Sequence, residues 1–493
     1  MTLTHILIFA AVALLCGALF KGRGRGWLML AASVLALYWL QPSTPLRNLD
    51  FWLPTASLAL TVIVWAATTA SVPTPSPALL SSALFRTGEG VPNRPTTEPP
   101  NNLLTIVVVL AVVLAIALNR YLALCCITPT RPPDAIRVVV ALVLISALTF
   151  SVSRLSGNYR LLFTLVAAII VLFIALKSDP WAQALSAGLR TLTGQAADQA
   201  SALDVRWLGF LYLAFRLIHA LRERMNGKLP ELSLQEFVTF VVFFPAITAG
   251  PIDRVERFVK DLRAPFTLSA SEVIGGGWRI VWGVFKKFVV ADTLAMIALN
   301  GINAAQVKSS LWLWVLLYAY AFRIYFDFSG YTDIAIGLGR LLGVKLPENF
   351  DRPYLRQNLT AFWNSWHITL AQWFRAYYFN PATRALRSRP LSPALIIFLT
   401  QFSTMILIGL WHGVTWNFVA WGAWHGLGLF VHNRWTDFTK PRATMLDTRP
   451  VLKRAAAWGG ALLTFHYVVL GWVWFALPEI GLAGRVMRRL FGA

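Results

Sequence analysis

The sequence predicts an all-α, polytopic transmembrane protein of about ten to thirteen spans. Of the 493 residues, 57% are hydrophobic and only 13% are charged, which is roughly half the charged fraction of ordinary soluble domains. The mean hydropathy is +0.60, and many apolar runs approach the length that crosses a bilayer. These observations exclude a single water-soluble globule, and the low charge excludes a long disordered chain.

The expected spans follow from the apolar runs, since a spanning helix needs about 20 mostly apolar residues. Long runs lie at about 3–20, 103–127, 136–153, 161–177, 205–221, 311–328, 393–410, 414–432 and 456–477. Shorter or interrupted runs lie at 27–41, 51–70 (which holds Pro54), 233–249 and 278–295. The interrupted runs make the number of spans a range rather than a single value.

The charge balance predicts membrane topology rather than a nucleic-acid partner. The formal net charge is +22, from 44 Lys and Arg against 22 Asp and Glu. No basic domain or nucleic-acid recognition motif accompanies this charge. Lys and Arg instead gather in short loops between apolar runs, as topology signals do. We therefore expect contact with membrane lipid, a multi-pass location in the cell membrane and no nucleic-acid partner.

Basic residues near the two ends of the chain predict its orientation. Three of them follow the first apolar run rather than precede it: Lys21, Arg23 and Arg25. This is the wrong order for a cleaved signal peptide, so we expect a retained first helix with its N-terminus outside and the 21–26 loop in the cytoplasm. The same rule predicts a cytoplasmic tail from three arginines, Arg485, Arg488 and Arg489.

Composition also divides the chain. Residues 71–102 are rich in Pro, Ser and Thr and predict a linker, because they hold too little apolar surface to offset the entropy of ordering. From Leu203 to about Trp435, short apolar runs alternate with loops that hold Pro, Gly, Asp and Arg. Polar residues at membrane depth are costly unless they line a cavity or find partners. The expected parts are N-terminal helices (1–70), the linker (71–102), further helices (103–200), a catalytic core (201–435), and a C-terminal helix with a basic tail (436–493).

Two histidines in this core are candidate catalytic residues. His412 lies in an apolar stretch from about Phe402 to Val431, which places it near the bilayer midplane. A neutral imidazole there suits a general base, and a core histidine bonded between helices is supported equally well by position alone. His367 lies among aromatic and polar residues, a pattern typical of a pocket or of an interfacial aromatic belt.

The sequence predicts no metal site. His412 and His425 are 13 residues apart, about 20 Å along a continuous helix, which is too far to hold one ion. No HExxH motif is present, and the cysteines (Cys16, Cys125 and Cys126) form no metal-ligand pattern and no disulfide framework.

Each group of charged residues in the core allows two interpretations of its role. Asp327 and Asp333 are interpreted first as buried carboxylates that tie helices together, with a paired acid and base as the alternative. Seven basic residues lie between positions 345 and 389, against only Glu348 and Asp351. This cluster predicts a topology anchor or lipid headgroup contact, or alternatively a docking face for an anionic donor such as coenzyme A.

Five motifs in order resemble the membrane-bound O-acyltransferase family, in the branch of alginate O-acetyltransferases and D-alanyl-teichoic-acid transfer proteins. They begin at Phe244 (FPAITAGPIDR), Asp327 (DFSGYTDIAIG), Pro347 (PENFDRPY), Phe362 (FWNSWHITL) and Gly409 (GLWHG, followed by WGAWHG). The resemblance covers about 200–435. It implies a helical fold with a tunnel through the membrane, a donor arriving from the cytoplasm and an acceptor arriving from outside.

The resemblance also implies an activity and a set of site residues. The expected activity is transfer of a short acyl group, acetyl in the first instance, to hydroxyls of a cell-surface glycan, with His412 as base and His367 as second catalytic residue. The motifs nominate as substrate contacts Asn364, Trp366, Trp411, Trp416, Asp327, Asp333 and Arg375. No cofactor is expected to be tightly bound, and the donor is expected to be acetyl-CoA or an acyl carrier thioester.

Three alternatives stay open at this point. The fold is compatible with fatty-acyl transfer to a lipid or protein, which sequence does not separate from transfer to a glycan. A transporter without chemistry also places polar residues at membrane depth, although no internal repeat supports it. The chain could also act as an acyl relay for an extracytoplasmic transferase of the SGNH type.

Overall fold

The computed structural model describes residues 2–19, 23–70, 102–122, 127–447 and 449–492. Within these residues the regular elements are helices, and strand-like pairing is limited to one bridge between Phe350 and Trp366. The predicted all-α class is therefore confirmed. Of the predicted linker, all but its final residue lies outside the described residues.

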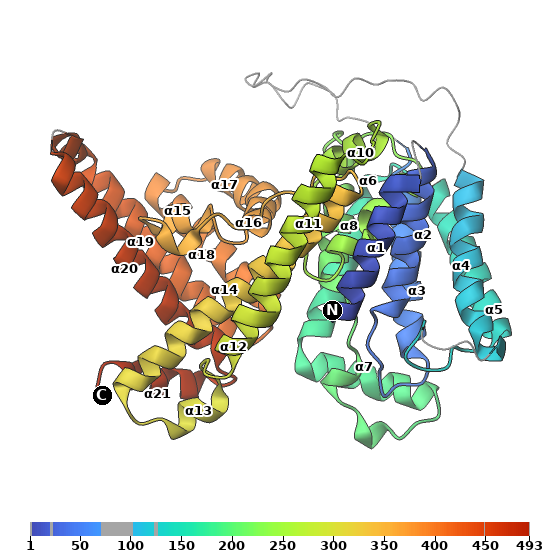
Figure 1. Cartoon of the computed structure of the whole chain (residues 1–493), viewed down its shortest axis with the longest axis horizontal. Coiled ribbons are helices and arrows are strands. Elements are labelled where there is room, and N and C mark those ends of the chain that lie inside the picture. The colour runs from blue at the N-terminus through green and yellow to red at the C-terminus, as the bar shows by residue number, and fades with distance from the viewer. Residues whose placement is uncertain (1, 20–22, 71–101, 123–126, 448, 493) are drawn as a thin grey trace.

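The first part of the chain forms the helices on the right of Figure 1. They are α1 (Leu3–Leu19), α2 (Arg23–Trp39), α3 (Leu49–Ala67), α4 (Asn102–Leu122), α5 (Ala135–Arg154), α6 (Tyr159–Lys177) and α7 (Asp179–Leu192). Short helices α8 (Phe210–Met225), α9 (Leu234–Val241) and α10 (Val255–Arg263) follow them.

The second part begins with a long antiparallel pair that crosses the centre of Figure 1. One member of the pair is formed by α11 (Ala270–Val284), a π-helical stretch (Phe285–Ala291) and α12 (Asp292–Ala295). After the short helix α13 (Gly301–Gln306), α14 (Ser310–Leu341) forms the other member. The chain continues as α15 (Leu359–Trp363), α16 (Ile368–Phe374), a second π-helical stretch (Arg375–Phe379), α17 (Asn380–Arg387), α18 (Pro393–His412), α19 (Trp416–Asp447), α20 (Pro450–Ala476) and α21 (Ile480–Leu490).

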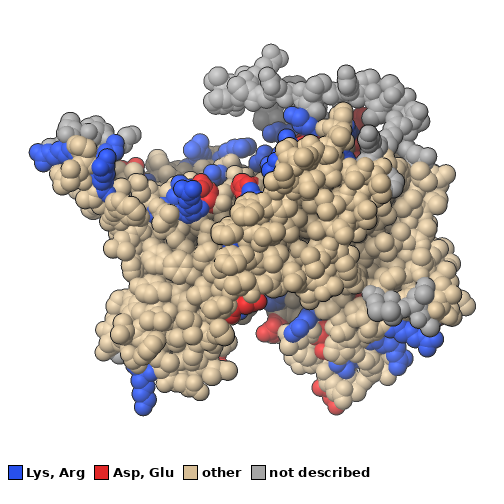
Figure 2. Space-filling model, in the orientation of Figure 1, with Lys and Arg blue, Asp and Glu red and all other residues tan. Residues whose placement is uncertain are grey.

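Seven helices of the described residues are long and apolar enough to cross a membrane: α3, α4, α5, α6, α14, α18 and α20. This finding supports a multi-pass membrane protein, with fewer full-length spans than the predicted range. Helices α1, α8 and α9 have 17, 16 and 8 residues, and the run at 278–295 divides into α11, a π-helical stretch and α12. On the face shown in Figure 2, most charged side chains lie toward the top and the bottom of the view, with a broad band between them that is nearly free of charge.

Short polar residues fix where several spans begin. The side chains of Asp134, Ser309 and Ser392 accept backbone N–H bonds in the first turns of α5, α14 and α18. Such N-caps satisfy donors that a helix leaves unbonded and are worth about 1 kcal/mol each. Two of these caps define the starts of α14 and α18, which carry residues of the candidate site.

Glycines bring α11 and α14 into backbone contact. A Cβ added to Gly283 would lie 2.6 Å from the carbonyl oxygen of Gly330, and one added to Gly337 would lie 2.7 Å from that of Gly276. The two pairs are seven residues apart on each helix, which is about two turns. Small residues in such a seam allow close packing between membrane helices.

The two ends of α14 mark the two faces of the molecule. A Cβ added to Gly17, near the end of α1, would lie 2.7 Å from the carbonyl oxygen of Leu341. At the other end of α14, Ser310 donates a 2.6 Å hydrogen bond to the carbonyl oxygen of Arg489 in α21. These ends are about 48 Å apart along a 32-residue helix.

Of the predicted 21–26 loop, Lys21 and residue 22 lie outside the described residues, and 23–26 form the start of α2. This end of α2 and the C-terminal arginines lie on opposite faces, so the expectation that both are cytoplasmic is wrong. The apolar run at 233–249 also departs from a simple pattern of crossings, because both of its ends lie on one face. Before it, the carbonyl oxygen of Leu232 accepts a bond from Trp65 near the end of α3, and after it Arg25 donates to the carbonyl oxygen of Asp261. Charge patterning does not reveal such a re-entrant segment, which changes the number of crossings by one.

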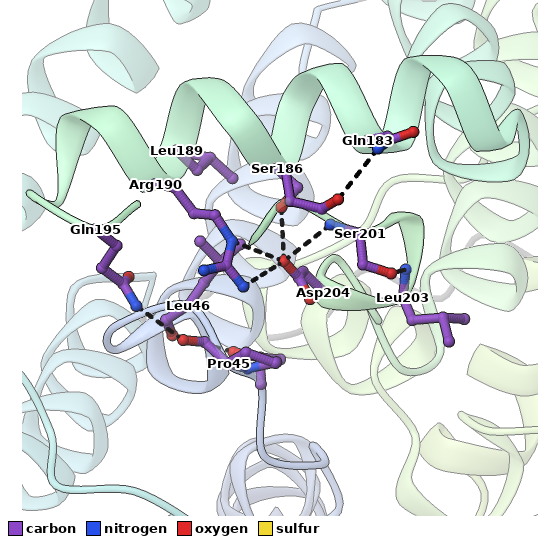
Figure 3. Close-up of polar contacts among 12 residues, drawn as sticks. Pro45, Leu46, Gln183, Ser186, Leu189, Arg190, Gln195, Ser201, Leu203 and Asp204 are labelled. Atoms are coloured by element: carbon purple, nitrogen blue, oxygen red, sulfur yellow. Dashed lines mark hydrogen bonds and ion pairs between the residues drawn. The ribbon is translucent and has the colours of Figure 1, made fainter. Parts of the chain in front are cut away.

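A buried ion pair ties α7 to the segment that leads into α8 (Figure 3). Asp204 is 4% exposed and accepts bonds from Arg190 at 2.8 Å and from Ser186 at 2.7 Å. Burial raises the pKa of Asp204, but the hydrogen bonds from Ser186 and Arg190 outweigh this effect and hold the pKa below its usual value. This network lies on the face opposite the 21–26 loop, where α6 ends.

Candidate active site

His412 is the last residue of α18, and Gly413 turns the chain toward α19. The sequence placed this imidazole inside an apolar stretch, and the structure breaks the helix there, at Gly413. The ring lies among aromatic rings, with centroids 4.5 Å from Trp411, 5.6 Å from Trp421 and 4.7 Å from Phe475.

His412 and His367 line one cavity, although 45 residues separate them in sequence. The cavity has a volume of about 30 Å³, enough to hold one water molecule. Its other lining residues come from α14, α15, α16, α18, α19, α20 and the loop before α16: Ile324, Phe328, Trp363, Trp366, Leu370, Ile408, Trp421, Trp472 and Phe475. The two predicted catalytic histidines therefore meet in an enclosure that is otherwise aliphatic and aromatic.

His367 is held in a strained backbone conformation. Its φ of 42° and ψ of 53° lie in the left-handed region, which costs a residue with a side chain about 1–3 kcal/mol. The side chain is 2% exposed, its Nε2 has no hydrogen-bond partner, and its ring centroid lies 4.7 Å from Phe328. Buried polar atoms are nearly always bonded, so an unpaired nitrogen at a cavity wall is suited to a ligand.

Asn349 clamps the backbone on which His367 sits. Its carbonyl oxygen accepts a 3.0 Å bond from the Ile368 N–H, and its side-chain Oδ1 accepts bonds from the N–H and the hydroxyl of Thr369 at 3.2 and 2.9 Å. Asn349 is fully buried. These three bonds hold the first turn of α16 and keep the strained residue in place.

The remaining predicted contacts divide between the cavity and other places. Trp366 lines the cavity. Trp411 does not line it but contacts both histidine rings, with centroids 5.8 Å from His367 and 4.5 Å from His412. Trp416 lies outside it, on the turn after Gly413, and is 73% exposed. The structure thus brings two of the three tryptophans to the histidines.

Asp327 and Asp333 lie on α14 away from the cavity, facing α11 and its π-helical extension. Asp327 accepts a 2.5 Å bond from Lys287, and Asp333 pairs with Arg279 and Lys286, both at 2.7 Å. Their observed partners are those expected of helix-tying carboxylates.

Asn364 and Arg375 are exposed and bond to each other at 2.7 Å without lining the cavity. They lie at the end of α15 and the start of the second π-helical stretch, on the surface that α15–α17 form in Figure 1. Any role of theirs in binding is at that surface.

A second cavity, of about 130 Å³, lies on the other side of α16. It is lined by His219, Ile252, Asp253, Arg254, Arg257, Pro347, Thr369, Gln372, Trp373 and Tyr377. It adjoins α10, whose C-terminal end is bound by Arg25, so it lies on the face of the 21–26 loop. Thr369 in its wall is two residues from His367 in the wall of the smaller cavity.

The wall of the second cavity is polar and charged. Asp253 bonds to Arg257 through Oδ1, while its buried Oδ2 has no partner. Burial raises the pKa of Asp253 to about 6, against the lowering effect of Arg257. Val255 N–H donates to Nε2 of His219, so Nδ1 carries the proton toward the Tyr377 hydroxyl, 2.5 Å away. A ligand with both donor and acceptor groups could bind there.

Among the described residues, no three His, Cys, Asp or Glu side chains gather into a group that could hold a metal ion. His425 is fully buried against Trp363 and Trp421, and neither of its ring nitrogens has a partner. It therefore packs behind the cavity wall and does not combine with the other histidines.

Several site residues carried no signal in the sequence. Ile324, Phe328 and Phe475 are apolar residues on long spans, where such residues are ordinary. Lys177 is the last residue of α6, and its Nζ donates a 3.3 Å hydrogen bond to the carbonyl oxygen of His412. A lysine at a helix end is also ordinary, so only the folded structure reveals its position.

Comparison with known proteins identifies what this arrangement resembles. The model of MBOAT, the membrane-bound O-acyltransferase family, matches residues 146–473. A probable alginate O-acetylase AlgI of Pseudomonas syringae is 34% identical over 293 residues, which cover 58% of this chain and 51% of that protein.

Two other relatives are named for different polymers. A peptidoglycan O-acetyltransferase of Helicobacter pylori is 33% identical over 55% of this chain and 51% of its own length. A teichoic acid D-alanyltransferase of Streptococcus thermophilus is 32% identical over 55% of this chain and 68% of its own length. The chain thus spans about half the length of the first relatives it matches.

Proposed function

The chain belongs to the membrane-bound O-acyltransferase family, and from that premise we propose that it moves an acetyl group from a cytoplasmic thioester to hydroxyls of a cell-surface polysaccharide. The observation that carries this proposal is the cavity into which both His412 and His367 face. Acetyl is favoured because two of the three relatives described above are named as O-acetylating enzymes. The place of action is the cell membrane.

The reaction needs one base. His412 accepts the proton of the acceptor hydroxyl as that oxygen attacks the thioester carbonyl, so that a C–O bond forms. The C–S bond then breaks, and the proton passes from the imidazole to the leaving thiolate. A neutral imidazole with an unbonded ring nitrogen can take this role. The unpaired Nε2 of His367, if protonated, donates to the carbonyl oxygen as negative charge develops there.

The donor enters, on this proposal, from the face of the 21–26 loop. The larger cavity opens on that face and supplies Arg254 and Arg257 for anionic groups of a coenzyme A or carrier-bound donor. The acceptor approaches from the opposite face, where His412 ends α18. An extracytoplasmic transferase of the SGNH type could take the acyl group onward, and the assay below separates these outcomes by where the label ends.

The test uses the purified full chain in liposomes with radiolabelled acetyl-CoA or acetylated carrier protein and an added polysaccharide. His412→Ala is expected to reduce ester formation by about 10²–10⁴-fold, the usual worth of general-base catalysis. His5→Ala, at a partly buried position near the start of α1 that does not line the cavity, is the matched control and is expected to be neutral.

A correctly folded His412→Ala protein that forms ester as fast as wild type would refute the assignment. Passage of intact donor into the liposomes without ester would favour a transporter. Label that reaches polysaccharide only when a partner transferase is added would favour the relay, and label found in lipid or protein would favour the other acceptor class.

A further inference from the structure

An uncompensated ammonium group lies beside the catalytic histidine. Helix α6 begins at Tyr159, near the end of α3, where Ser156 donates a 3.2 Å bond to the Ala67 carbonyl oxygen. It runs for 19 residues, about 28 Å, to the face opposite the 21–26 loop. There Lys177 Nζ donates its 3.3 Å bond to the His412 carbonyl oxygen.

Other lysines of the helical core have carboxylate partners. Lys286 pairs with Asp333 at 2.7 Å and Lys287 pairs with Asp327 at 2.5 Å. Lys177, which is partly buried, makes its one recorded hydrogen bond to a backbone carbonyl, and no ion pair among the described residues includes it. An ammonium has three donors, so two remain for a ligand, and withdrawing a cation from water without a counter-charge is costly.

The surface next to this ammonium suits a sugar. The turn after His412 exposes Val414, Thr415 and Trp416, and the indole of Trp416 is 73% exposed. A flat aromatic ring packs well against the C–H face of a pyranose, and its N–H supplies a polar edge. The imidazole of His412 and the ring of Trp416 thus belong to one short segment around the α18–α19 turn, and the ammonium reaches that segment from α6 through the His412 carbonyl oxygen.

We propose that Lys177 binds an acidic group of the acceptor glycan, a carboxylate or a phosphate, and so places a neighbouring hydroxyl at His412. Lys177 is then a specificity-determining residue, and Trp416 packs against the sugar ring. The inference rests on the proposed function and adds the charge of the acceptor to it. The rival reading is structural, because a lysine at the C-terminal end of a helix also stabilises its unbonded carbonyls.

Equilibrium binding separates these readings without requiring turnover. The full chain in lipid nanodiscs is titrated with a uronic-acid oligosaccharide, with the same oligosaccharide after its carboxyl groups are reduced to alcohols, and with a glycerol-phosphate oligomer. Lys177→Met is compared with Lys177→Arg and with Lys308→Met. Lys308 is an exposed lysine that precedes α14 on the same face and provides the matched loss of charge.

The wild type is expected to bind at least one acidic oligomer, more weakly at high salt, and to bind the reduced oligosaccharide poorly. Lys177→Met is expected to weaken acidic binding about 10- to 100-fold, as for loss of a hydrogen bond to a charged group. Lys177→Arg and Lys308→Met are expected to stay near wild type. The acidic oligomer that binds identifies the group as carboxylate or phosphate.

Three results overturn the proposal: no acidic oligomer binds, the reduced oligosaccharide binds equally well, or Lys177→Met leaves acidic binding unchanged. A lower melting temperature for Lys177→Met with unchanged affinities would establish the structural reading instead. His412→Ala is expected to bind the acidic oligomer like wild type. Loss of transfer with binding retained therefore distinguishes failure of the proposed reaction from failure of this inference.

Discussion

Replacing Asn349 by alanine tests whether the clamp on His367 matters for activity. The change removes the acceptor for two donors of Thr369 and leaves them in a fully buried environment. Each unsatisfied buried donor costs about 1–3 kcal/mol, so the lost side-chain bonds are worth about 2–6 kcal/mol. The strain at His367, about 1–3 kcal/mol, is then opposed by one backbone bond, from Ile368 N–H to the carbonyl oxygen of residue 349, instead of by three bonds. The imidazole is therefore expected to leave its position in a larger fraction of the molecules.

The expected result for Asn349→Ala is a fall in kcat of at least about 10- to 100-fold, which corresponds to about 1.4–2.8 kcal/mol in the transition state. The assay is ester formation in liposomes, together with the melting temperature in detergent. Thr369→Ser keeps both donors and is the control, expected to be close to wild type.

A double-mutant cycle with Thr369→Val checks the cause. If the two residues act through their shared hydrogen bond, the combined effect is smaller than the sum of the single effects. A stable Asn349→Ala protein with wild-type kcat contradicts the reasoning, because it would show that the strained conformation persists without the clamp.

Three further predictions concern stability. In α11, Gly283→Ala is expected to destabilise the protein by about 1–3 kcal/mol because its Cβ meets the Gly330 carbonyl oxygen. A Cβ at Gly277 meets nothing within 4 Å, so Gly277→Ala is expected to stabilise the protein by about 0.5–1 kcal/mol. Equal melting temperatures for the two variants would contradict this prediction. Asp333→Ala leaves Arg279 and Lys286 around a site where the carboxylate had 10% side-chain exposure, so we expect it to lower the free energy of unfolding by about 3–5 kcal/mol. The same substitution at the half-exposed Asp327 is expected to cost about 1 kcal/mol or less. Loss of activity without loss of stability would instead support substrate binding. Because the pKa of Asp204 is lower in the folded than in the unfolded protein, its carboxylate stabilises the fold above the unfolded pKa, and this stabilisation is lost as pH falls. Wild type should therefore lose more thermal stability below about pH 4 than Asp204→Asn does. Parallel curves of melting temperature against pH for the two proteins would refute this role of Asp204.

The site residues that the sequence predicted are polar residues that interrupt apolar or aromatic runs. His412 and His367 were found because imidazoles among apolar and aromatic residues need an explanation, and the structure places both on one cavity. The helical class and most long runs were predictable for the same reason, since length and hydropathy decide which segments can span a bilayer.

Features that depend on tertiary contacts were not predictable. Ile324 and Phe328 face the cavity, but their periodicity matches that of residues facing lipid. Lys177 reaches His412 from another helix, and no local pattern encodes that approach. The orientation of the C-terminal arginines was wrong because that expectation rested on their charge alone. The packing of α21 against the start of α14, which places them on the other face, depends on tertiary contacts.

The glycine seam between α11 and α14 determines which wall of the cavity can move. Sliding either helix by one residue would place a Cβ against the opposite backbone at both glycine contacts, Gly283–Gly330 and Gly276–Gly337. We therefore expect the two helices to move as one rigid unit. Ile324 and Phe328 belong to α14, one of these two helices, whereas other walls of the cavity come from α18, α19 and α20. If the chain transfers an acetyl group as proposed, a space for one water is too small for an acetyl thioester and a hydroxyl together, so we expect α18–α20 to move during turnover.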